Sequence, residues 1–265
     1  DRISSFEPYF FASLGKKIAS LKASGMDVIR LDMGAPDLPP EEFIVDALVQ
    51  NARRADAHSY TPMGGSPAFK QAVADYYMDR FEVSFDPKTE IIGLIGSKEG
   101  VFNLSQVILN PGDIALVPDP GYPVYGASGM IAGAEIVYMP LEAKNGFLPD
   151  FNAIPADKLK RAKLLWLNYP NNPTGAVASM DFFEQAVLFA REHHILIAHD
   201  APYTDVCFDG YNAPSLMQVP GAREVAVEFN SLSKTYNMAG WRLGMAVGNA
   251  DVIDYLYNYK SQMDS

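Results

Sequence analysis

The chain has 265 residues, 48% of them hydrophobic, and a formal net charge of −11. This length fits one large α/β domain or two small ones. The acidic balance argues against a nucleic-acid partner, which would need a stripe of Lys and Arg to neutralise phosphates. No apolar run approaches the roughly 20 residues that span a bilayer, so we expect no membrane role. The single cysteine, Cys207, excludes an intrachain disulfide and favours a cytoplasmic protein.

The first forty residues differ in pattern from the rest of the chain. Residues 6–21 have helical spacing, residues 27–31 have the character of a strand, and residues 34–40 are rich in Gly and Pro. We therefore expect residues 1–40 to form an N-terminal arm and part of a small α+β domain. Residues 41–265 are expected to form a large domain, with a loop at residues 56–65.

From about residue 90, short apolar runs alternate with longer amphipathic segments. This alternation is typical of a mainly parallel sheet covered by helices. Helical spacing is clearest at residues 180–193, and the last helix is expected at residues 250–259. The expected fold class is α/β, a three-layer α/β/α domain around a mainly parallel seven-stranded sheet, with strands at residues 91–95, 114–118, 135–139, 163–168, 195–199, 225–229 and 245–247.

Polar segments rich in Gly and Pro follow the ends of several expected strands. In an open α/β sheet, ligands bind beyond the carboxyl ends of the strands. We therefore expect a single composite site, built from residues 96–98, 119–122, 168–175, 200–203 and 231–234.

Lys234 follows an apolar strand directly and lies among small hydroxyl residues. This setting fits a lysine that forms a Schiff base, because such an amine must lose its proton before it attacks an aldehyde. Burial and a neighbouring cation such as Arg242 would lower the pKa of the amine. The alternative is a surface lysine that caps the end of a strand.

Three further residues fit the binding of a pyridine ring. Asp200 ends a strand, and its carboxylate could pair with a pyridinium nitrogen and keep the ring an electron sink. Tyr203 and Asn172 could both hydrogen-bond a phenolic oxygen on that ring. The alternatives are an ordinary aspartate cap and a rigid turn at residues 169–175.

Residues 96–100 lie between an expected strand and helix, where backbone N–H groups and the Ser97 hydroxyl could bind a phosphate. Tyr122 could stack on a flat ring, although a buried structural tyrosine is the alternative. His193, His194 and His199 show no closed set of metal ligands, so we expect no metal site.

Taken together, these segments resemble the class I/II aminotransferases, which are fold-type-I enzymes dependent on pyridoxal 5'-phosphate. The Asn-Pro-Thr-Gly turn, the Asp-x-x-Tyr pair, and Ser-x-Ser-Lys followed eight residues later by Arg all occur in the family order. The resemblance implies that Lys234 forms the Schiff base and moves a proton between the substrate Cα and the cofactor C4′. It further implies cofactor contacts by Asp200 at the ring nitrogen, Asn172 and Tyr203 at the ring oxygen, Tyr122 on the ring face, and Ser97, Lys98, Ser231, Ser233 and Arg242 at the phosphate.

The resemblance also implies a homodimer with shared active sites. Tyr60 resembles the tyrosine that reaches the phosphate of the neighbouring subunit. Gly34 and Asn172 resemble residues that contact the substrate. Family members continue into a C-terminal small domain with an arginine that binds the substrate carboxylate. We expect that domain to be absent here, and no residue of this chain is assigned that role.

Within the family, the amino-acid sequence at residues 96–100, 118–125, 145–150 and 231–241 is most similar to that of the LL-diaminopimelate aminotransferases. This implies transfer of an amino group between LL-diaminopimelate and 2-oxoglutarate, in lysine biosynthesis. Aminotransferases for aspartate, alanine or aromatic amino acids remain alternatives. So do a pyridoxal-phosphate-dependent C–S β-lyase and a truncated cofactor-binding module without turnover.

Overall fold

The computed structural model describes residues 10–32 and 34–264, which fall into two compact units, Asp1–Pro36 and Asp37–Ser265. The first unit contains helix α1 (Phe10–Ala23). The expected helix at residues 6–21 is therefore confirmed in its described part and ends two residues later, while residues 6–9 lie outside the described residues. The expected strand at residues 27–31 is wrong. Ile29 and Leu31 are 81% and 93% exposed, and a strand without a neighbour leaves its backbone groups unpaired.

The second unit is built on one seven-stranded sheet with the strand order β1-β7-β6-β5-β4-β2-β3. Strand β7 runs antiparallel to both neighbours, and the remaining pairings are parallel. All seven expected strands are confirmed, with ends shifted by two residues at most. Their bounds are β1 (Ile91–Ile95), β2 (Ile114–Asp119), β3 (Glu135–Pro140), β4 (Ala162–Leu167), β5 (Leu196–Asp200), β6 (Ala226–Ser231) and β7 (Leu243–Gly248).

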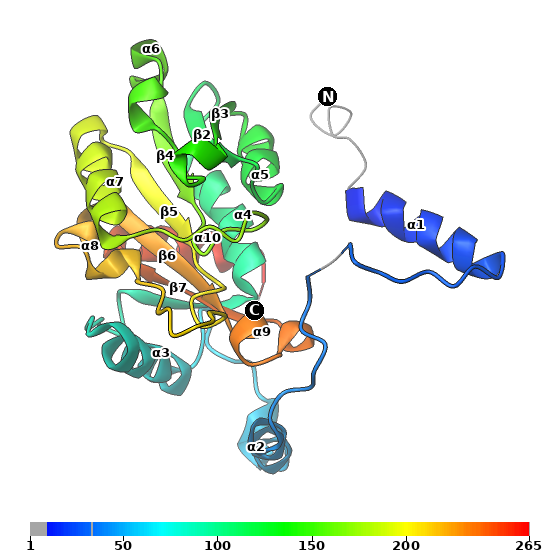
Figure 1. Ribbon diagram of the computed structural model, residues 1–265. Coiled ribbons are helices and arrows are strands. Elements are labelled where there is room, and N and C mark those ends of the chain that lie inside the picture. Colours follow the sequence, from blue (N-terminus) through cyan, green and yellow to red (C-terminus); the bar gives the residue numbers. More distant parts are fainter. Residues whose placement is uncertain (1–9, 33, 265) are drawn as a thin grey trace. The chain divides into compact units, whose positions relative to one another are not determined.

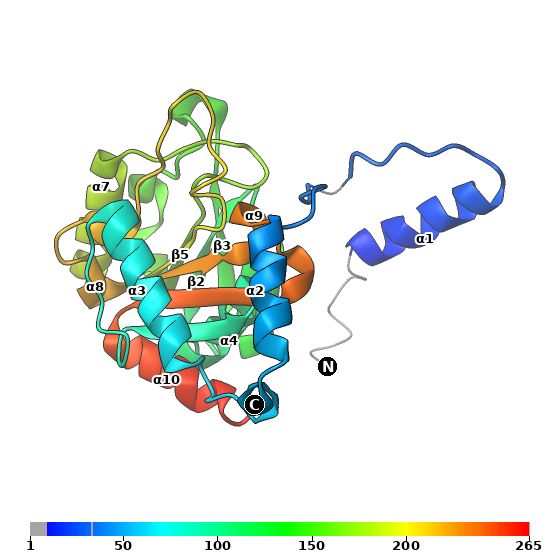
Figure 2. The same cartoon turned by 90° about the horizontal axis from the view of Figure 1, so that it is seen from below.

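Helices cover both faces of the sheet (Figures 1 and 2). Helices α3 (Pro67–Phe81) and α7 (Met180–His193) pack their apolar side chains on one face. Helices α4 (Ser97–Ile108), α5 (Val124–Ala132) and α10 (Ala250–Lys260) pack on the other. The strands other than the edge strand β3 are mostly buried on both sides, so they read in the sequence as nearly continuous apolar runs.

The helices expected at residues 180–193 and 250–259 are both confirmed, and side chains before each of them fix its start. Ser179 accepts a hydrogen bond from the backbone of Phe182, and Asn249 accepts one from Val252. Within the described part of the chain, no helix is long and apolar enough to cross a membrane. The remaining helices are α2 (Glu42–Ala52), α6 (Ala156–Leu159), α8 (Ala222–Val225) and α9 (Leu232–Thr235), with 3₁₀ turns η2 (Ala55–His58), η3 (Ala143–Asn145), η4 (Phe151–Ala153), η5 (Leu216–Gln218) and η6 (Ala239–Trp241).

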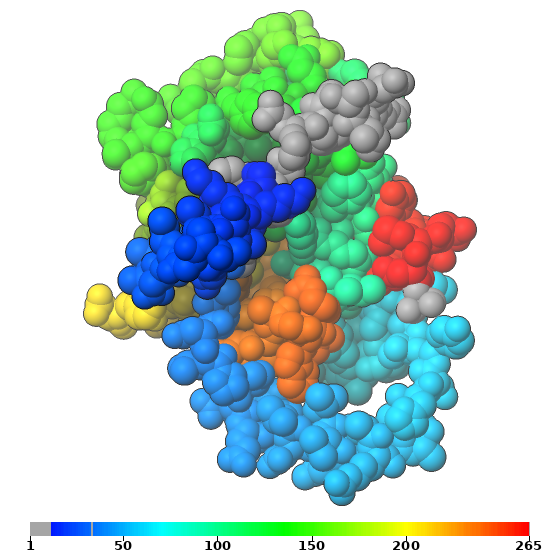
Figure 3. All heavy atoms as spheres, turned by 90° about the vertical axis from the view of Figure 1, so that its right-hand side faces the viewer, coloured from blue at the N-terminus to red at the C-terminus, as the bar shows by residue number. Residues whose placement is uncertain are grey.

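The topology brings the polar segments together at one edge of the sheet. Strands β1, β2, β4, β5 and β6 share one direction, so the segments that follow them leave the sheet at the same edge. The segment after β6, drawn in orange, reaches the molecular surface in Figure 3. This edge is where the sequence predicts a site.

Candidate active site

Asp200, at the end of β5, has a buried carboxylate of which only one oxygen accepts a hydrogen bond. Its side chain is 5% exposed. The Tyr125 hydroxyl donates to Oδ2 at 2.7 Å, whereas Oδ1 has no hydrogen-bond partner among the described residues. Burial raises the pKa of Asp200 to about 6, and the Tyr125 hydrogen bond and the charge of His199 act in the opposite direction. A buried oxygen without a partner indicates a position where a ligand atom can donate.

Tyr125 is a site residue that the sequence reasoning did not single out. It lies in α5, fully buried, and stacks on the Trp166 ring of β4 at a centroid distance of 4.7 Å. Its ring also meets Tyr122 edge-on at 5.7 Å. The only signal in the sequence is its spacing of three residues from Tyr122, which places the two on one face of a helical turn.

Asn172, Tyr203 and Lys234 come from three different segments and lie together. The Asn172 amide donates to the Tyr203 hydroxyl at 3.4 Å. The Lys234 amine lies 5.8 Å from the centre of the Tyr203 ring. Burial lowers the pKa of the Lys234 amine and, with the nearby Asp200 carboxylate, raises the pKa of Tyr203. A lowered amine pKa increases the fraction of unprotonated lysine, the form that attacks a carbonyl carbon.

Asn168, directly after β4, fixes the turn that carries Asn172. It lies in the expected segment 168–175, but the sequence reasoning did not single it out. Its amide donates to the Asp200 backbone oxygen at 2.6 Å, and its Oδ1 accepts from the Asn172 backbone at 2.7 Å. Within the same turn, the Asn171 side chain accepts from both the backbone and the hydroxyl of Thr174. The turn is thus held against β5 before any ligand binds.

A second group of expected residues surrounds the start of α4. The helix begins at Ser97, so the first backbone N–H groups lack partners within the helix and suit an anion. Gly96 precedes it with φ +71°, and a side chain there would collide with the Arg242 guanidinium. Arg242 itself donates to the Ala239 carbonyl at 2.9 Å.

The strand register brings Ser231 and Ser233, the two serines expected to bind the phosphate, close to the start of α4. Leu94 in β1 pairs with Gly244 in β7, which pairs in turn with Ser231 in β6. The Ser231 hydroxyl accepts from the Ser233 backbone at 3.2 Å, and both side chains are buried. A Cβ on Gly244 would lie 2.5 Å from the Ser97 backbone nitrogen. These contacts bring the start of α4 close to the end of β6.

The remaining expected residues are less tightly placed. The Lys98 amine lies 6.0 Å from the centre of the Tyr122 ring. Tyr60 is 91% exposed. Gly34 belongs to the first compact unit, so its contact with a substrate stays a prediction.

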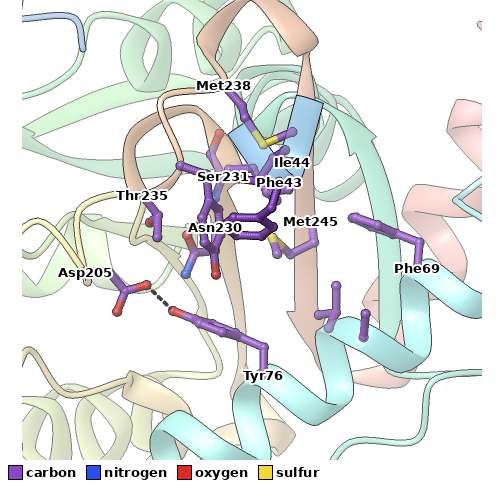
Figure 4. A pocket seen from close by; sticks show the side chains of 14 residues that line it. Phe43, Ile44, Phe69, Tyr76, Asp205, Asn230, Ser231, Thr235, Met238 and Met245 are labelled. Atoms are coloured by element: carbon purple, nitrogen blue, oxygen red, sulfur yellow. Dashed lines mark hydrogen bonds between the residues drawn. The ribbon is translucent and has the colours of Figure 1, made fainter. Parts of the chain in front are cut away.

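An apolar pocket of about 330 Å³ lies next to the lysine segment (Figure 4). Phe43 of α2 and Phe69 of α3 contribute to its wall, and Tyr76 and Asp205, which also line it, form a hydrogen bond of 2.7 Å. The lining includes Ser231, an expected phosphate contact, but neither Lys234 nor Asp200, so the pocket borders the candidate active site without containing these two side chains. No group of three or more His, Cys, Asp or Glu side chains that could hold a metal occurs among residues 10–32 and 34–264.

Comparisons with known proteins decide the family. Residues 26–265 match the family model described as aminotransferase class I and II. The chain belongs to this family. It is 52% identical over 264 residues to the LL-diaminopimelate aminotransferases of Dehalococcoides mccartyi and Moorella thermoacetica, covering 100% of this chain and 68% of each relative. The family depends on pyridoxal phosphate and carries out transamination.

Solved aminotransferase structures share the fold. The apo structure of BacF from Bacillus subtilis has a TM-score of 0.94 and 40% identity, covering 98% of this chain and 66% of that one. A probable N-succinyldiaminopimelate aminotransferase from Thermus thermophilus has a TM-score of 0.90 and 37% identity, covering 96% and 68%. The chain thus spans about two thirds of the length of these relatives, and the α/β fold is that of the family.

The described side chains fit pyridoxal phosphate. The unpartnered Asp200 Oδ1 provides the acceptor that a protonated pyridine nitrogen requires. The start of α4, the two buried serines and the Arg242 guanidinium provide donors for a phosphate. The ring nitrogen and the phosphate of the cofactor therefore each have side chains of matching chemistry.

We expect Asp200→Asn to remove a pH dependence from the stability of the cofactor-free protein. The folded pKa of about 6 exceeds the ordinary value of 3.8, so the native state holds this proton where the unfolded state has lost it. The stabilisation is present below the unfolded pKa and is lost as the pH rises through 6. Between pH 5 and 8 the wild type should lose about 1 kcal/mol more than the variant.

Urea unfolding of both proteins across this pH range, without cofactor, measures the difference. Parallel stability profiles would contradict the assignment of the raised pKa to Asp200.

We expect Gly244→Ala to weaken pyridoxal phosphate binding by about tenfold, since overpacking against fixed backbone costs roughly 1–3 kcal/mol. The new methyl group would push Ser97 away from the expected phosphate position. Gly240→Ala is the matched control, because a Cβ at Gly240 meets nothing within 4 Å. Absorbance titration with the cofactor measures both affinities. Equal affinities in the two variants would exclude this close approach as a binding determinant.

Proposed function

We propose that this chain forms the cofactor-binding part of an aminotransferase that transfers the amino group of LL-diaminopimelate to 2-oxoglutarate, a step in lysine biosynthesis. The observation that carries the proposal is the buried, half-paired Asp200 carboxylate, one strand away from the segment that bears Lys234. Support for the substrate comes from relatives named LL-diaminopimelate aminotransferase, which match the whole chain at 47% to 52% identity.

The cofactor, when bound, supplies an aldehyde and a ring that accepts electrons from the substrate Cα. In our proposal, the Lys234 amine would hold the cofactor at its aldehyde carbon and would take the proton from the substrate Cα. Asp200 keeps the ring nitrogen protonated through its Oδ1, while Tyr125 holds the other carboxylate oxygen. Asn172 and Tyr203 donate to the ring oxygen.

The same proposal assigns the ring face to Tyr122. Ser97, the Lys98 backbone, Ser231, Ser233 and Arg242 bind the phosphate. The charge-assisted hydrogen bonds of this group would anchor the cofactor. The substrate itself meets Asn172 and Gly34.

We also propose that the protein acts as a homodimer with shared active sites, in the cytoplasm. Each residue of α2 is at least partly exposed, and Phe43, Leu48 and Val49 present 71%, 50% and 45% of their surface. Apolar helical surface of this kind is typical of an interface with another chain. Tyr60 follows the same segment and would reach the phosphate bound by the partner. The cytoplasmic assignment rests on the single cysteine.

The first test of the function is an absorbance spectrum with pyridoxal phosphate and a panel of amino donors. We expect a visible band of the bound cofactor that LL-diaminopimelate converts to the pyridoxamine form. Lys234→Ala should remove the band, because the amine that reacts with the cofactor is lost, whereas the exposed Lys160→Ala should keep it.

Other outcomes have definite meanings. If only aspartate, alanine or an aromatic amino acid converts the bound cofactor to the pyridoxamine form, that amino acid is the donor instead of LL-diaminopimelate. Release of ammonia and a keto acid would indicate a C–S β-lyase. A band that no donor shifts would indicate a binding module without turnover, and the lack of any band would overturn the proposal.

We expect Tyr60→Ala to weaken cofactor binding by about tenfold, because one hydrogen bond to a charged group contributes roughly 1.5–3 kcal/mol. Mixing this variant with Lys234→Ala should restore tight binding. One site of each mixed dimer then combines an intact Lys234 with an intact Tyr60 from the other chain. Affinity that stays low in the mixture, with mixed dimers verified by mass spectrometry, would contradict the shared site.

A further inference from the structure

Glu228 lies in the middle of β6, fully buried and on the opposite face of the sheet from the Asp200 side chain. Its carboxyl group takes part in four hydrogen bonds. Oε1 accepts from the hydroxyls of Tyr77 and Ser215 at 2.9 and 2.8 Å. Oε2 accepts from the Leu216 backbone at 3.0 Å and faces the His199 Nδ1 at 2.8 Å. A carboxyl group offers about four hydrogen-bonding positions, so those of Glu228 are all occupied.

His199 connects this carboxylate to the turn of the candidate site. Its ring is fully buried, with the edge of the Phe183 ring from α7 packed beside it. While Nδ1 faces Glu228, Nε2 faces the Tyr169 backbone oxygen at 3.1 Å. The Tyr169 carbonyl can only accept, so Nε2 carries a hydrogen and donates it to this oxygen. Nδ1 and the Glu228 carboxyl share a second hydrogen bond.

The His199–Glu228 contact joins three segments that carry expected cofactor residues. Glu228 belongs to β6, which leads into Lys234. His199 immediately precedes Asp200 in β5, with its side chain on the other face of the sheet because successive side chains alternate. Tyr169 precedes the Asn172 turn, which Asn168 holds from its other side.

Stability alone is a weak reason for such a pair. Burying polar groups costs free energy even when they are hydrogen-bonded to each other, and replacing both partners by apolar groups of the same shape can be nearly neutral. A histidine that hydrogen-bonds through both ring nitrogens does something an apolar side chain cannot. It fixes the backbone of a neighbouring turn at a defined distance from the strand.

We propose that His199 is a positioning residue that, oriented by Glu228, holds the Tyr169 carbonyl so that the Asn172 amide reaches the ring oxygen of the cofactor. This inference rests on the proposed function, since it concerns the same site. It assigns a role to the face of the sheet opposite the cofactor, and it adds His199 and Glu228 to the residues on which cofactor binding depends.

Two substitutions at His199 separate its two hydrogen bonds. His199→Asn keeps a donor near the Nδ1 position, so Glu228 stays paired, but its amide is too short to reach Tyr169. His199→Gln places its amide near the Nε2 position and keeps the contact with Tyr169. We expect the Asn variant to bind pyridoxal phosphate about tenfold more weakly, within the range of coupling between contacting residues. The Gln variant should stay close to wild type.

The decisive readout uses 3-deoxypyridoxal phosphate, which lacks the ring oxygen. If His199 acts through Asn172, the tenfold difference between wild type and His199→Asn should vanish with this analogue. For the same reason, His199→Asn should add nothing in an Asn172→Ala background. Absorbance titration gives the affinities, and thermal unfolding reports the stability of each variant.

Equal loss in both His199 variants, a loss that persists with the analogue, or additive effects with Asn172→Ala would each overturn the inference. If His199→Asn does not fold, His199→Phe combined with Glu228→Gln removes the link without leaving a buried charge, and the same analogue-dependent loss is expected. Failure of the wild type to bind the cofactor would overturn the proposed function instead. Tight wild-type binding with an unaffected Asn variant would overturn only the role of His199.

Discussion

The buried carboxylate of Asp200 is the constraint on which the candidate active site depends. Removing a carboxylate from water is costly unless hydrogen bonds or charges replace its hydration. Here the fold supplies one donor, the Tyr125 hydroxyl, and leaves the other oxygen without a partner among the described residues. The raised pKa of Asp200 is the physical sign of that shortage. In our proposal, a cationic ring nitrogen would supply the missing donor.

The sheet uses both of its faces to support this arrangement. On the Asp200 face, the Trp166 ring fixes Tyr125 by stacking. On the other face, Glu228 and His199 hold the turn that precedes Asn172. The two sets never touch the same atoms, yet they meet at the ends of β5 and β6. A ligand that binds at this edge is therefore positioned by packing on one side and by hydrogen bonds on the other.

The expected phosphate side of the site depends on close approach of backbone rather than on side-chain packing. Gly96 leaves room for the Arg242 guanidinium, and Gly244 lets β7 pass against the start of α4. The antiparallel β7 makes this possible, because its register places Gly244 between Leu94 and Ser231. Small residues at such positions reflect steric exclusion, which the local sequence does not reveal.

The sequence by itself determined the seven strands, the helices at residues 180–193 and 250–259, and the polar segments at the strand ends, because periodicity and turn chemistry are local. It did not determine which side chains meet. The Tyr125–Asp200 and Asn168–Asp200 hydrogen bonds join residues 75 and 32 positions apart, and His199 and Glu228 are 29 apart. Residues 27–31 show the same limit, since apolar residues suited to a strand form none without a neighbour to pair with. Only the tertiary structure decided these contacts, because strand order and register set which distant residues become neighbours.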